Sequence, residues 1–240
     1  MAPFALVTCA NKGIGFAVAA GLGRLGHSVF LGARDETRGR TAEAALRAEG
    51  LDVRFLLLDV DDDASVAAAA RRIGETAGRL DVLVNNAALK LERAPSPPSE
   101  CSLDVVRATF ETNVFGAIRV ILATLPLLRR SDAPRVVNVS SGLGSSALAT
   151  TEGSRYQAKP LLGYNVAKAA LNSVTVQFAN ELRDTAFKIN AVDPGFTDTD
   201  MTDGATRTAE QAAAAIVRAT TLPADGPNGC FFDEHGELPW

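Results

Sequence analysis

The chain has 240 residues, a formal net charge of −4 at pH 7 and 47% hydrophobic residues. This length and composition suit a single domain over residues 1–240, with one sizeable core. The acidic balance provides no basic field for nucleic acid or for an anionic membrane surface, so we expect a small-molecule partner.

The cysteines and histidines are few and scattered. Cys9, Cys101 and Cys230 form no CxxC pair, which fits a reducing compartment. His27 and His235 are too far apart in sequence to indicate a metal site or a hydrolase triad. No basic segment opens the chain and no apolar run approaches the roughly 20 residues that span a membrane. We therefore expect a cytoplasmic protein without a metal or a membrane contact.

Short runs rich in leucine or β-branched residues alternate with longer helical patterns. The predicted strands are 4–7, 29–32, 53–58, 82–84, 135–139, 188–192 and 230–232, and the predicted helices are 14–25, 38–49, 64–76, 103–128, 164–183 and 208–220. The helix over 103–128 is expected to break near Asn113 and Pro126. This alternation is typical of βαβ crossovers. It predicts an α/β fold of the Rossmann type: a doubly wound, seven-stranded, mostly parallel sheet with helices on both faces.

A glycine-containing turn follows the first predicted strand. It runs from Thr8 to Gly15 and leads into an alanine-rich helix. Glycines at such a helix start let the backbone approach a pyrophosphate, which free N–H groups and the positive helix end then bind. The turn therefore predicts a dinucleotide site formed by Asn11, Lys12, Gly13, Ile14 and Gly15; a tight strand-to-helix corner without a ligand is the alternative.

The end of the second strand indicates which dinucleotide binds. The small Ala33 stands where NAD-specific proteins of this architecture commonly carry an acid for the ribose hydroxyls, and Arg34 follows it. A guanidinium can grip a phosphate, and Lys12 can add a second charge from the neighbouring turn. We predict NADP(H) rather than NAD(H) as cofactor; alternatively, the two cations are ordinary surface residues.

Tyr164 and Lys168 are four positions apart, so they share one face of a predicted helix. A nearby ammonium can lower the pKa of a phenol below its usual value of about 10, which would make Tyr164 a useful proton donor near neutral pH. A surface tyrosine beside a solvated lysine is the alternative reading of the pair alone.

Taken together, these motifs resemble the short-chain dehydrogenase/reductase family, especially its carbonyl reductase branch. The resemblance covers nearly the whole chain and rests on motifs in family order: Thr8–Gly15, Ala33–Asp35, Leu58–Val60, Asn85–Ala88, Asn113, Val139–Ser141, Tyr164–Lys168 and Pro194–Thr199.

The resemblance implies catalytic roles for Asn113, Ser141, Tyr164 and Lys168. Tyr164 would protonate the substrate carbonyl oxygen, Ser141 would donate a hydrogen bond to it, and Lys168 would hold the cofactor ribose. Asn113 would hold a water that links the lysine to solvent, although a plain helix-break residue is the alternative. Ser140, the other serine of the pair, is expected to be structural.

The resemblance also implies further contacts to the cofactor. The expected residues are Asp59, Val60, Asn86, Ala87, Pro194, Gly195, Thr197 and Thr199, together with Tyr164 and Lys168. Asp59 could instead be only a turn former or a helix N-terminal acid. Phe196 is expected to form a wall of the substrate pocket, which favours an apolar ketone or aldehyde.

Three departures from the family pattern stand out. Cys9 replaces the first glycine of the turn, and Ala88 replaces the glycine of the usual Asn-Asn-Ala-Gly run, so cofactor affinity is in question. The stretch between Ser141 and Tyr164 is longer than in many members, and it resembles in position an insertion that keeps some carbonyl reductases monomeric. The sequence leaves open whether this chain is a monomer or a homo-oligomer. We expect the loop 197–207 to close over ligand.

The sequence thus predicts an NADPH-dependent carbonyl reductase that transfers hydride to a prochiral ketone or aldehyde, with reversible alcohol oxidation. Two alternatives remain. One is a non-catalytic NADP(H)-binding sensor or scaffold, because fold does not dictate function. The other is a non-redox member that uses the same tyrosine for isomerisation or dehydration.

Overall fold

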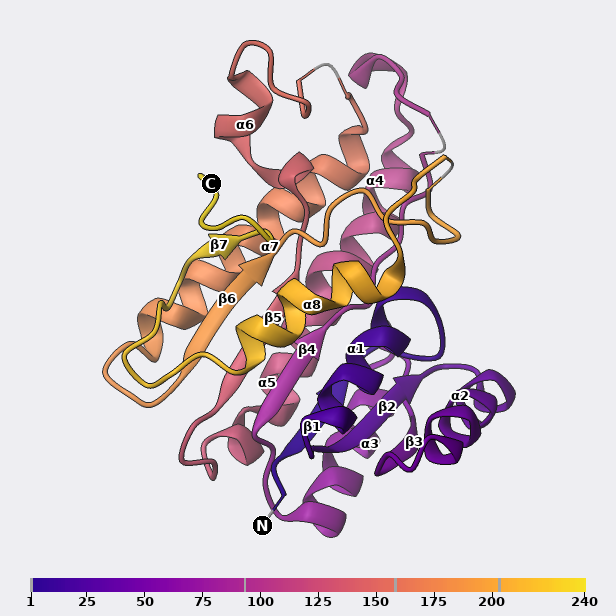
Figure 1. The fold of residues 1–240 in the computed structure, drawn as a ribbon. Coiled ribbons are helices and arrows are strands. Elements are labelled where there is room, and N and C mark those ends of the chain that lie inside the picture. The colour runs from indigo at the N-terminus through magenta and orange to yellow at the C-terminus, as the bar shows by residue number, and fades with distance from the viewer. Residues whose placement is uncertain (1, 93, 158, 203) are drawn as a thin grey trace.

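The computed structural model describes residues 2–92, 94–157, 159–202 and 204–240. Within them, one sheet of seven strands runs through the molecule in the order β3-β2-β1-β4-β5-β6-β7 (Figure 1). Every neighbouring pair is parallel. The strands are β1 Phe4–Val7, β2 Ser28–Ala33, β3 Val53–Leu57, β4 Val82–Asn85, β5 Arg135–Val139, β6 Lys188–Val192 and β7 Phe231–Phe232. Each of the predicted strands is present.

Helices cover both faces of this sheet, as predicted. The longer ones are α1 Gly13–Arg24, α2 Glu36–Ala48, α3 Asp63–Ala77, α4 Leu103–Phe110, α5 Ala117–Leu128, α7 Leu162–Glu181 and α8 Ala209–Thr220. Buried side chains of α1, α2 and α8 pack against one face, and those of α3, α5 and α7 pack against the other. Strands such as β2 and β5 are buried along their whole length, which explains their mostly apolar sequence, whereas the edge strand β3 is partly exposed.

The helix predicted over 103–128 is continuous but irregular. Between α4 and α5 lies one π-helical segment, Glu111–Gly116, that contains Asn113, while Pro126 sits in the last turn of α5 without ending it. By length and composition the whole segment Leu103–Leu128 could cross a membrane, although the sequence suggested no such run. Half of its most apolar window is buried, because this helix packs into the core of the domain.

Loops gather at the carboxyl ends of the strands, at the upper end of Figure 1. The long stretch after Ser141 forms a short 3₁₀ turn, Gly142–Gly144, and then α6, Ser146–Thr150. The C-terminus packs beside α6, where Ala147 N donates to Trp240 O at 3.0 Å and Trp240 stacks on Phe231. The described part of this stretch therefore lies over the carboxyl ends of the strands.

Phe115 of the π segment and Leu122 of α5 remain about half exposed.

Candidate active site

The turn after β1 contains two residues in the left-handed backbone region. Gly13 has a φ of +54°, and Cys9 has a φ of +52°, the one positive value for a non-glycine residue in the described ranges. Ala10 N donates to Gly32 O at 2.9 Å, which ties the turn to the end of β2. Cys9 thus adopts the left-handed conformation for which glycine is suited.

Gly15 lets the turn and the end of β4 approach each other closely. A Cβ atom on Gly15 would lie 2.5 Å from Asn86 Nδ2 and 2.6 Å from Cys9 O. The Asn86 amide donates to Thr8 O at 3.0 Å and to Cys9 O at 3.2 Å, while Ala87 N donates to Thr8 Oγ1. Asn86 therefore fixes the turn itself, a role that the sequence did not indicate.

Two cations stand beside this turn. Arg34 is exposed at the end of β2, and Lys12 pairs with Asp200 of the loop that follows β6. Burial raises the pKa of the Cys9 thiol, and the charges of Lys12 and Arg34 partly oppose that shift. The loop also reaches the turn through Thr199, whose Cγ2 lies 3.7 Å from the position of a Cβ on Gly13. Within the loop 197–207 that is expected to close over ligand, Thr199 and Asp200 thus already contact this turn.

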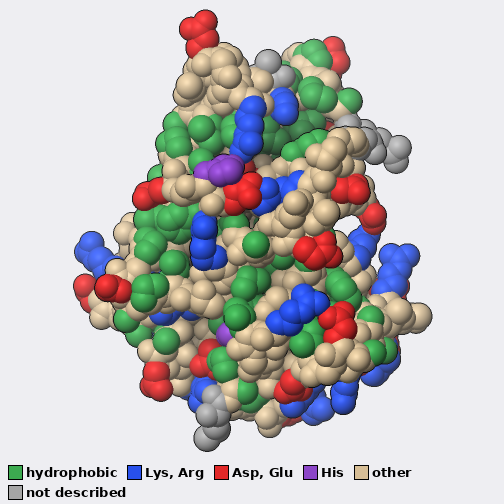
Figure 2. All heavy atoms as spheres, in the orientation of Figure 1, with side chains coloured by type: hydrophobic (Ala, Val, Ile, Leu, Met, Phe, Trp, Pro, Cys, Tyr) green, Lys and Arg blue, Asp and Glu red, His purple; other side chains and the backbone are tan. Residues whose placement is uncertain are grey.

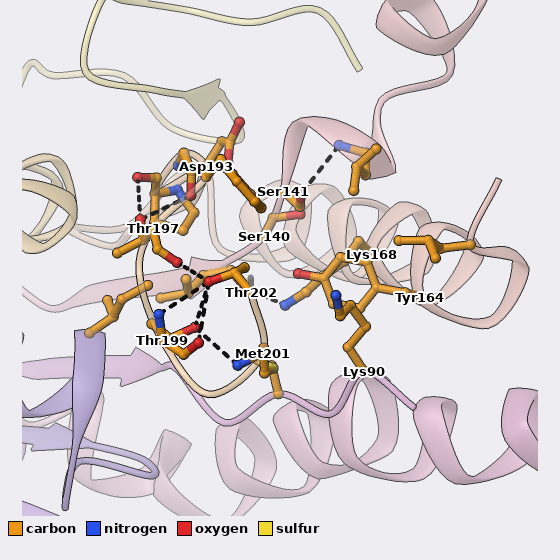
Figure 3. A pocket seen from close by; sticks show the side chains of 18 of the residues that line it. Lys90, Ser140, Ser141, Tyr164, Lys168, Asp193, Thr197, Thr199, Met201 and Thr202 are labelled. Atoms are coloured by element: carbon orange, nitrogen blue, oxygen red, sulfur yellow. Dashed lines mark hydrogen bonds between the residues drawn. The ribbon is translucent and has the colours of Figure 1, made fainter. Parts of the chain in front are cut away.

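Tyr164 and Lys168 extend from the first turns of α7 into one pocket (Figure 3). The Lys168 side chain is 1% exposed, and its Nζ lies 5.7 Å from the centre of the Tyr164 ring. That ammonium donates to Val139 O at 2.7 Å. The pair therefore shares one helix face, as its spacing predicts.

The electrostatics of the pair differ from the expectation. Burial raises the pKa of Tyr164, the Asp193 carboxylate raises it further, and the neighbouring Ser141 acts in the opposite direction. Burial lowers the pKa of Lys168 to about 8, and Asp193 partly opposes that shift. The expectation that Lys168 lowers the phenol pKa is wrong, because the Lys168 ammonium is directed at Val139 O and desolvation dominates the phenol pKa.

The two adjacent serines have different surroundings. Ser140 is 2% exposed and bonds Asn172 Oδ1 at 2.5 Å, so it serves the packing of α7 on β5. Ser141 lines the pocket, and its Oγ accepts from Leu143 N at 3.2 Å. A serine hydroxyl can accept this bond and still donate one, so Ser141 remains able to bind a carbonyl oxygen.

Asn113 is buried at 1% exposure and uses its amide to hold the chain after β4. Its Oδ1 accepts from Leu89 N at 2.6 Å, and its Nδ2 donates to Leu89 O at 3.0 Å. The side chain therefore supports the wall of the site. A role in holding a water remains a prediction.

The predicted cofactor residues are spread along the same edge of the sheet. The pocket is lined by Ile14 and by residues that follow β6, namely Pro194, Gly195, Phe196, Thr197 and Thr199. Of these, Phe196 is 61% exposed. Asp59 follows β3 and accepts from Asp61 N at 3.1 Å, so it is at least a turn former. Val60 is 8% exposed and packs against Gly116.

Sequence reasoning missed a second tyrosine at the site. Tyr156, from the insertion, donates to Asp193 Oδ2 at 2.7 Å, while Gly195 N donates to Asp193 Oδ1 at 2.9 Å. Tyr156 also packs on Gly142, where a Cβ would lie 2.2 Å from its Cζ. The signals were present, since the chain has only two tyrosines and Asp193 directly precedes the Pro194–Gly195 motif.

Some of the predicted site residues are outside the lining of the pocket: Asn11, Lys12, Gly13, Gly15, Arg34, Asp59, Val60, Ala87 and Asn113. The other predicted site residues, together with Tyr156, line one cavity of about 390 Å³. It extends from the phosphate turn, at Ile14 and Asn86, past Ser141, Tyr164 and Lys168. A cavity of this kind at the carboxyl ends of parallel strands is where open α/β folds bind their ligands. Two hydroxyl donors and a buried cation converge there, which suits a reaction that builds negative charge on one oxygen.

Comparison with known proteins agrees with this geometry. The family model described as short chain dehydrogenase matches residues 3–210. The chain is 35% identical to carbonyl reductase 1 (NADPH) of Mus musculus, over 99% of this chain and 98% of that one, and 34% identical to (+)-neomenthol dehydrogenase of Arabidopsis thaliana, over 95% of each.

Solved structures show the same fold. Salutaridine reductase from Papaver somniferum superposes with a TM-score of 0.82 at 30% identity, over 97% of this chain and 99% of that chain. An NADPH-bound carbonyl reductase from chicken fatty liver gives a TM-score of 0.86 at 25% identity, over 100% and 99% of the two chains. The chain therefore belongs to the short-chain dehydrogenase/reductase family of oxidoreductases and lies on its carbonyl reductase-like branch.

Proposed function

We propose that the protein is an NADPH-dependent carbonyl reductase that acts on ketones or aldehydes, with Tyr164 as general acid. The observation that carries the proposal is the shared cavity, in which Ser141, Tyr164 and Lys168 stand beside the glycine turn. The relatives named for NADPH carbonyl reduction support it.

The residues around the turn fit NADP(H). Gly13 and Gly15 leave room for a close approach of pyrophosphate, and α1 begins there with free N–H groups. Ala33 places no carboxylate at the end of β2, while Arg34 and Lys12 supply two positive charges. The two positive charges would attract a 2′-phosphate at this position. The ion pair between Lys12 and Asp200 would have to break before Lys12 could bind that phosphate.

The chemistry divides simply between cofactor and protein. NADPH, when bound, supplies the hydride. Tyr164 donates its phenolic proton to the carbonyl oxygen as charge develops there, and Ser141 donates a hydrogen bond to the same oxygen. The Lys168 ammonium, which donates to Val139 O, would hold the ribose hydroxyls of the bound cofactor.

The raised pKa of Tyr164 favours reduction near neutral pH. The phenol stays protonated there, which is the form that a proton donor needs, whereas alcohol oxidation needs the deprotonated form. We therefore expect the pH optimum for oxidation of an alcohol to lie above the optimum for reduction of the matching ketone. Initial rates in both directions between pH 6 and 10 measure this difference.

Replacement of the phenol oxygen tests the proposal directly. Tyr164→Phe should lower kcat by roughly two to four orders of magnitude, because only the proton donor is removed. NADPH affinity, measured by quenching of protein fluorescence, should change little. Near-full activity in Tyr164→Phe would remove this tyrosine from the mechanism.

Cofactor choice is tested at the end of β2. Arg34→Ala should weaken NADPH binding by roughly tenfold or more and leave NADH binding nearly unchanged, because only NADPH carries the 2′-phosphate. Arg47→Ala, at the far end of α2, is the control. An unchanged ratio of the two affinities would show that the 2′-phosphate is not bound there.

A further inference from the structure

The pocket carries a cation that the reaction itself does not use. Lys90 follows β4 and lines the cavity, and its side chain extends into the pocket in the direction of Tyr164 (Figure 3). It is partly buried. No carboxylate among the described residues pairs with it, in contrast to Lys12, which pairs with Asp200.

The backbone on both sides of Lys90 is firmly held. Asn113 bonds both the N–H and the carbonyl of Leu89. Two residues after Lys90, the Glu92 carboxylate accepts from Gly163 N at 3.1 Å and from Tyr164 N at 2.9 Å. The base of the Lys90 side chain is therefore fixed relative to the catalytic helix. A lysine whose backbone is held in this way loses less conformational entropy on binding a ligand than a lysine on a mobile loop does.

The charge around the cavity is predominantly positive. Besides Lys168, its lining includes Lys90, Arg155 and Lys159, although the protein as a whole carries −4. Arg155 contacts the Tyr156 hydroxyl and lies 3.9 Å from Asp233. Asp193 lines the cavity too, but it is 4% exposed and its oxygens already accept from Tyr156 and Gly195. Basic and hydrophobic side chains also reach the surface together at the upper end of Figure 2.

Apart from several hydroxyl and amide side chains, such as Thr197 and Thr202, the remaining walls are apolar. Leu143, Leu161, Pro95, Phe196 and Met201 all line the same cavity. A substrate that matches both features has a hydrocarbon body and one anionic group. The carbonyl would lie at Tyr164 and the anion near Lys90, where a charge-assisted hydrogen bond is strengthened by the partly dry surroundings.

We propose that the preferred substrates are carbonyl compounds with a carboxylate close to the ketone, and that Lys90 binds this carboxylate. The inference rests on the proposed function. In the reaction, the carbonyl carbon gains a hydride from NADPH and its oxygen gains a proton from Tyr164, so that a keto acid becomes a hydroxy acid and NADPH becomes NADP⁺.

A matched pair of substrates tests this role. Benzoylformate and its methyl ester have the same ketone and ring and differ in the negative charge. The native enzyme should have the higher kcat/KM with the acid. Lys90→Met should lower kcat/KM for the acid by roughly 10- to 100-fold, mainly through KM, and leave the ester within about twofold. Added salt should weaken the acid's advantage in the native enzyme only.

Two further variants complete the design. Lys188→Met makes the same change at the start of β6, outside the cavity lining, and should leave both substrates unaffected. Lys90→Glu should reverse the preference toward the ester. NADPH affinity should stay constant in all three variants, because Lys90 is assigned to the substrate.

The outcomes separate this inference from the proposed function. If the ester is reduced and the acid is no better, or if Lys90→Met affects both equally, the role of Lys90 is overturned while the carbonyl reductase assignment stands. If neither these substrates nor a panel of neutral ketones is reduced, the proposed function fails, and this inference fails with it.

Discussion

At the scale of single residues, Cys9 shows a local cost within the cofactor turn. Its φ of +52° lies in the left-handed region, where a Cβ atom costs roughly 1–2 kcal/mol. Cys9→Gly should therefore raise the free energy of unfolding by about 1 kcal/mol, after the greater entropy of glycine in the unfolded chain is subtracted. Urea denaturation of the protein without cofactor measures the change.

Cys9→Ala is the matched control, because it removes the thiol and keeps the Cβ atom. It should leave the free energy of unfolding unchanged or slightly lower it. Equal stabilisation by alanine and glycine would show that the thiol, rather than the backbone conformation, carries the cost. NADPH affinity should rise in Cys9→Gly if the strained turn also resists closure around the pyrophosphate.

At the scale of elements, local patterns predicted nearly every helix and strand. The strands are rich in apolar and β-branched residues, and the helices carry their own start signals, such as Asp62 before α3 and Thr208 before α8. The π segment around Asn113 and the short helix α6 were not predicted, since neither has a distinct period. Within the site, Ser141, Tyr164 and Lys168 could be found from spacing and family resemblance.

The remaining site residues depend on contacts between distant parts of the chain. Glu92 caps α7, Asn113 holds Leu89, and Tyr156 bonds Asp193. No local pattern encodes such pairs, because each arises only when separate loops meet at one edge of the sheet. The same reason explains why the direction of the Tyr164 pKa shift was predicted wrongly. The four-residue spacing shows that a lysine is nearby, but it does not show how deeply the phenol is buried.

The cap on α7 gives a prediction for the whole helix. Leu161, the residue before α7, makes no capping hydrogen bond with its side chain. Instead, the Glu92 carboxylate accepts hydrogen bonds from the N–H groups of Gly163 and Tyr164 in the first turn of the helix. Glu92→Ala should lower the free energy of unfolding by about 1–2 kcal/mol. It should also lower kcat more than it changes KM for NADPH, because Tyr164 loses its fixed position.

Glu92→Gln should recover part of both losses, since an amide keeps one acceptor oxygen. Glu100→Ala changes an exposed acid of the same loop and should alter neither quantity. A Glu92→Ala protein with native kcat would show that the cap is structural and does not position the tyrosine.

At the scale of the whole molecule, the buried Lys168 makes stability depend on pH. Its pKa is lowered from 10.5 to about 8 in the folded protein. Below about pH 8 the ammonium is charged in both folded and unfolded chains, and the full cost of burying it is present. Between about pH 8 and 10.5 the unfolded chain binds a proton that the folded protein has released, so this contribution to the free energy of unfolding rises with pH.

Removing that charge should make the protein more stable and inactive. Lys168→Met should raise the free energy of unfolding at pH 7 by about 1–2 kcal/mol, because the loss of the bond to Val139 O offsets part of the gain. Denaturant unfolding of both proteins at pH 7 and pH 9.5 should show this difference shrinking at the higher pH. Lys188→Met corrects for the general effect of removing a lysine. A difference that is negative at pH 7, or that grows toward pH 9.5, would contradict the assignment of Lys168 as a buried cation held at a cost to stability for the sake of the reaction.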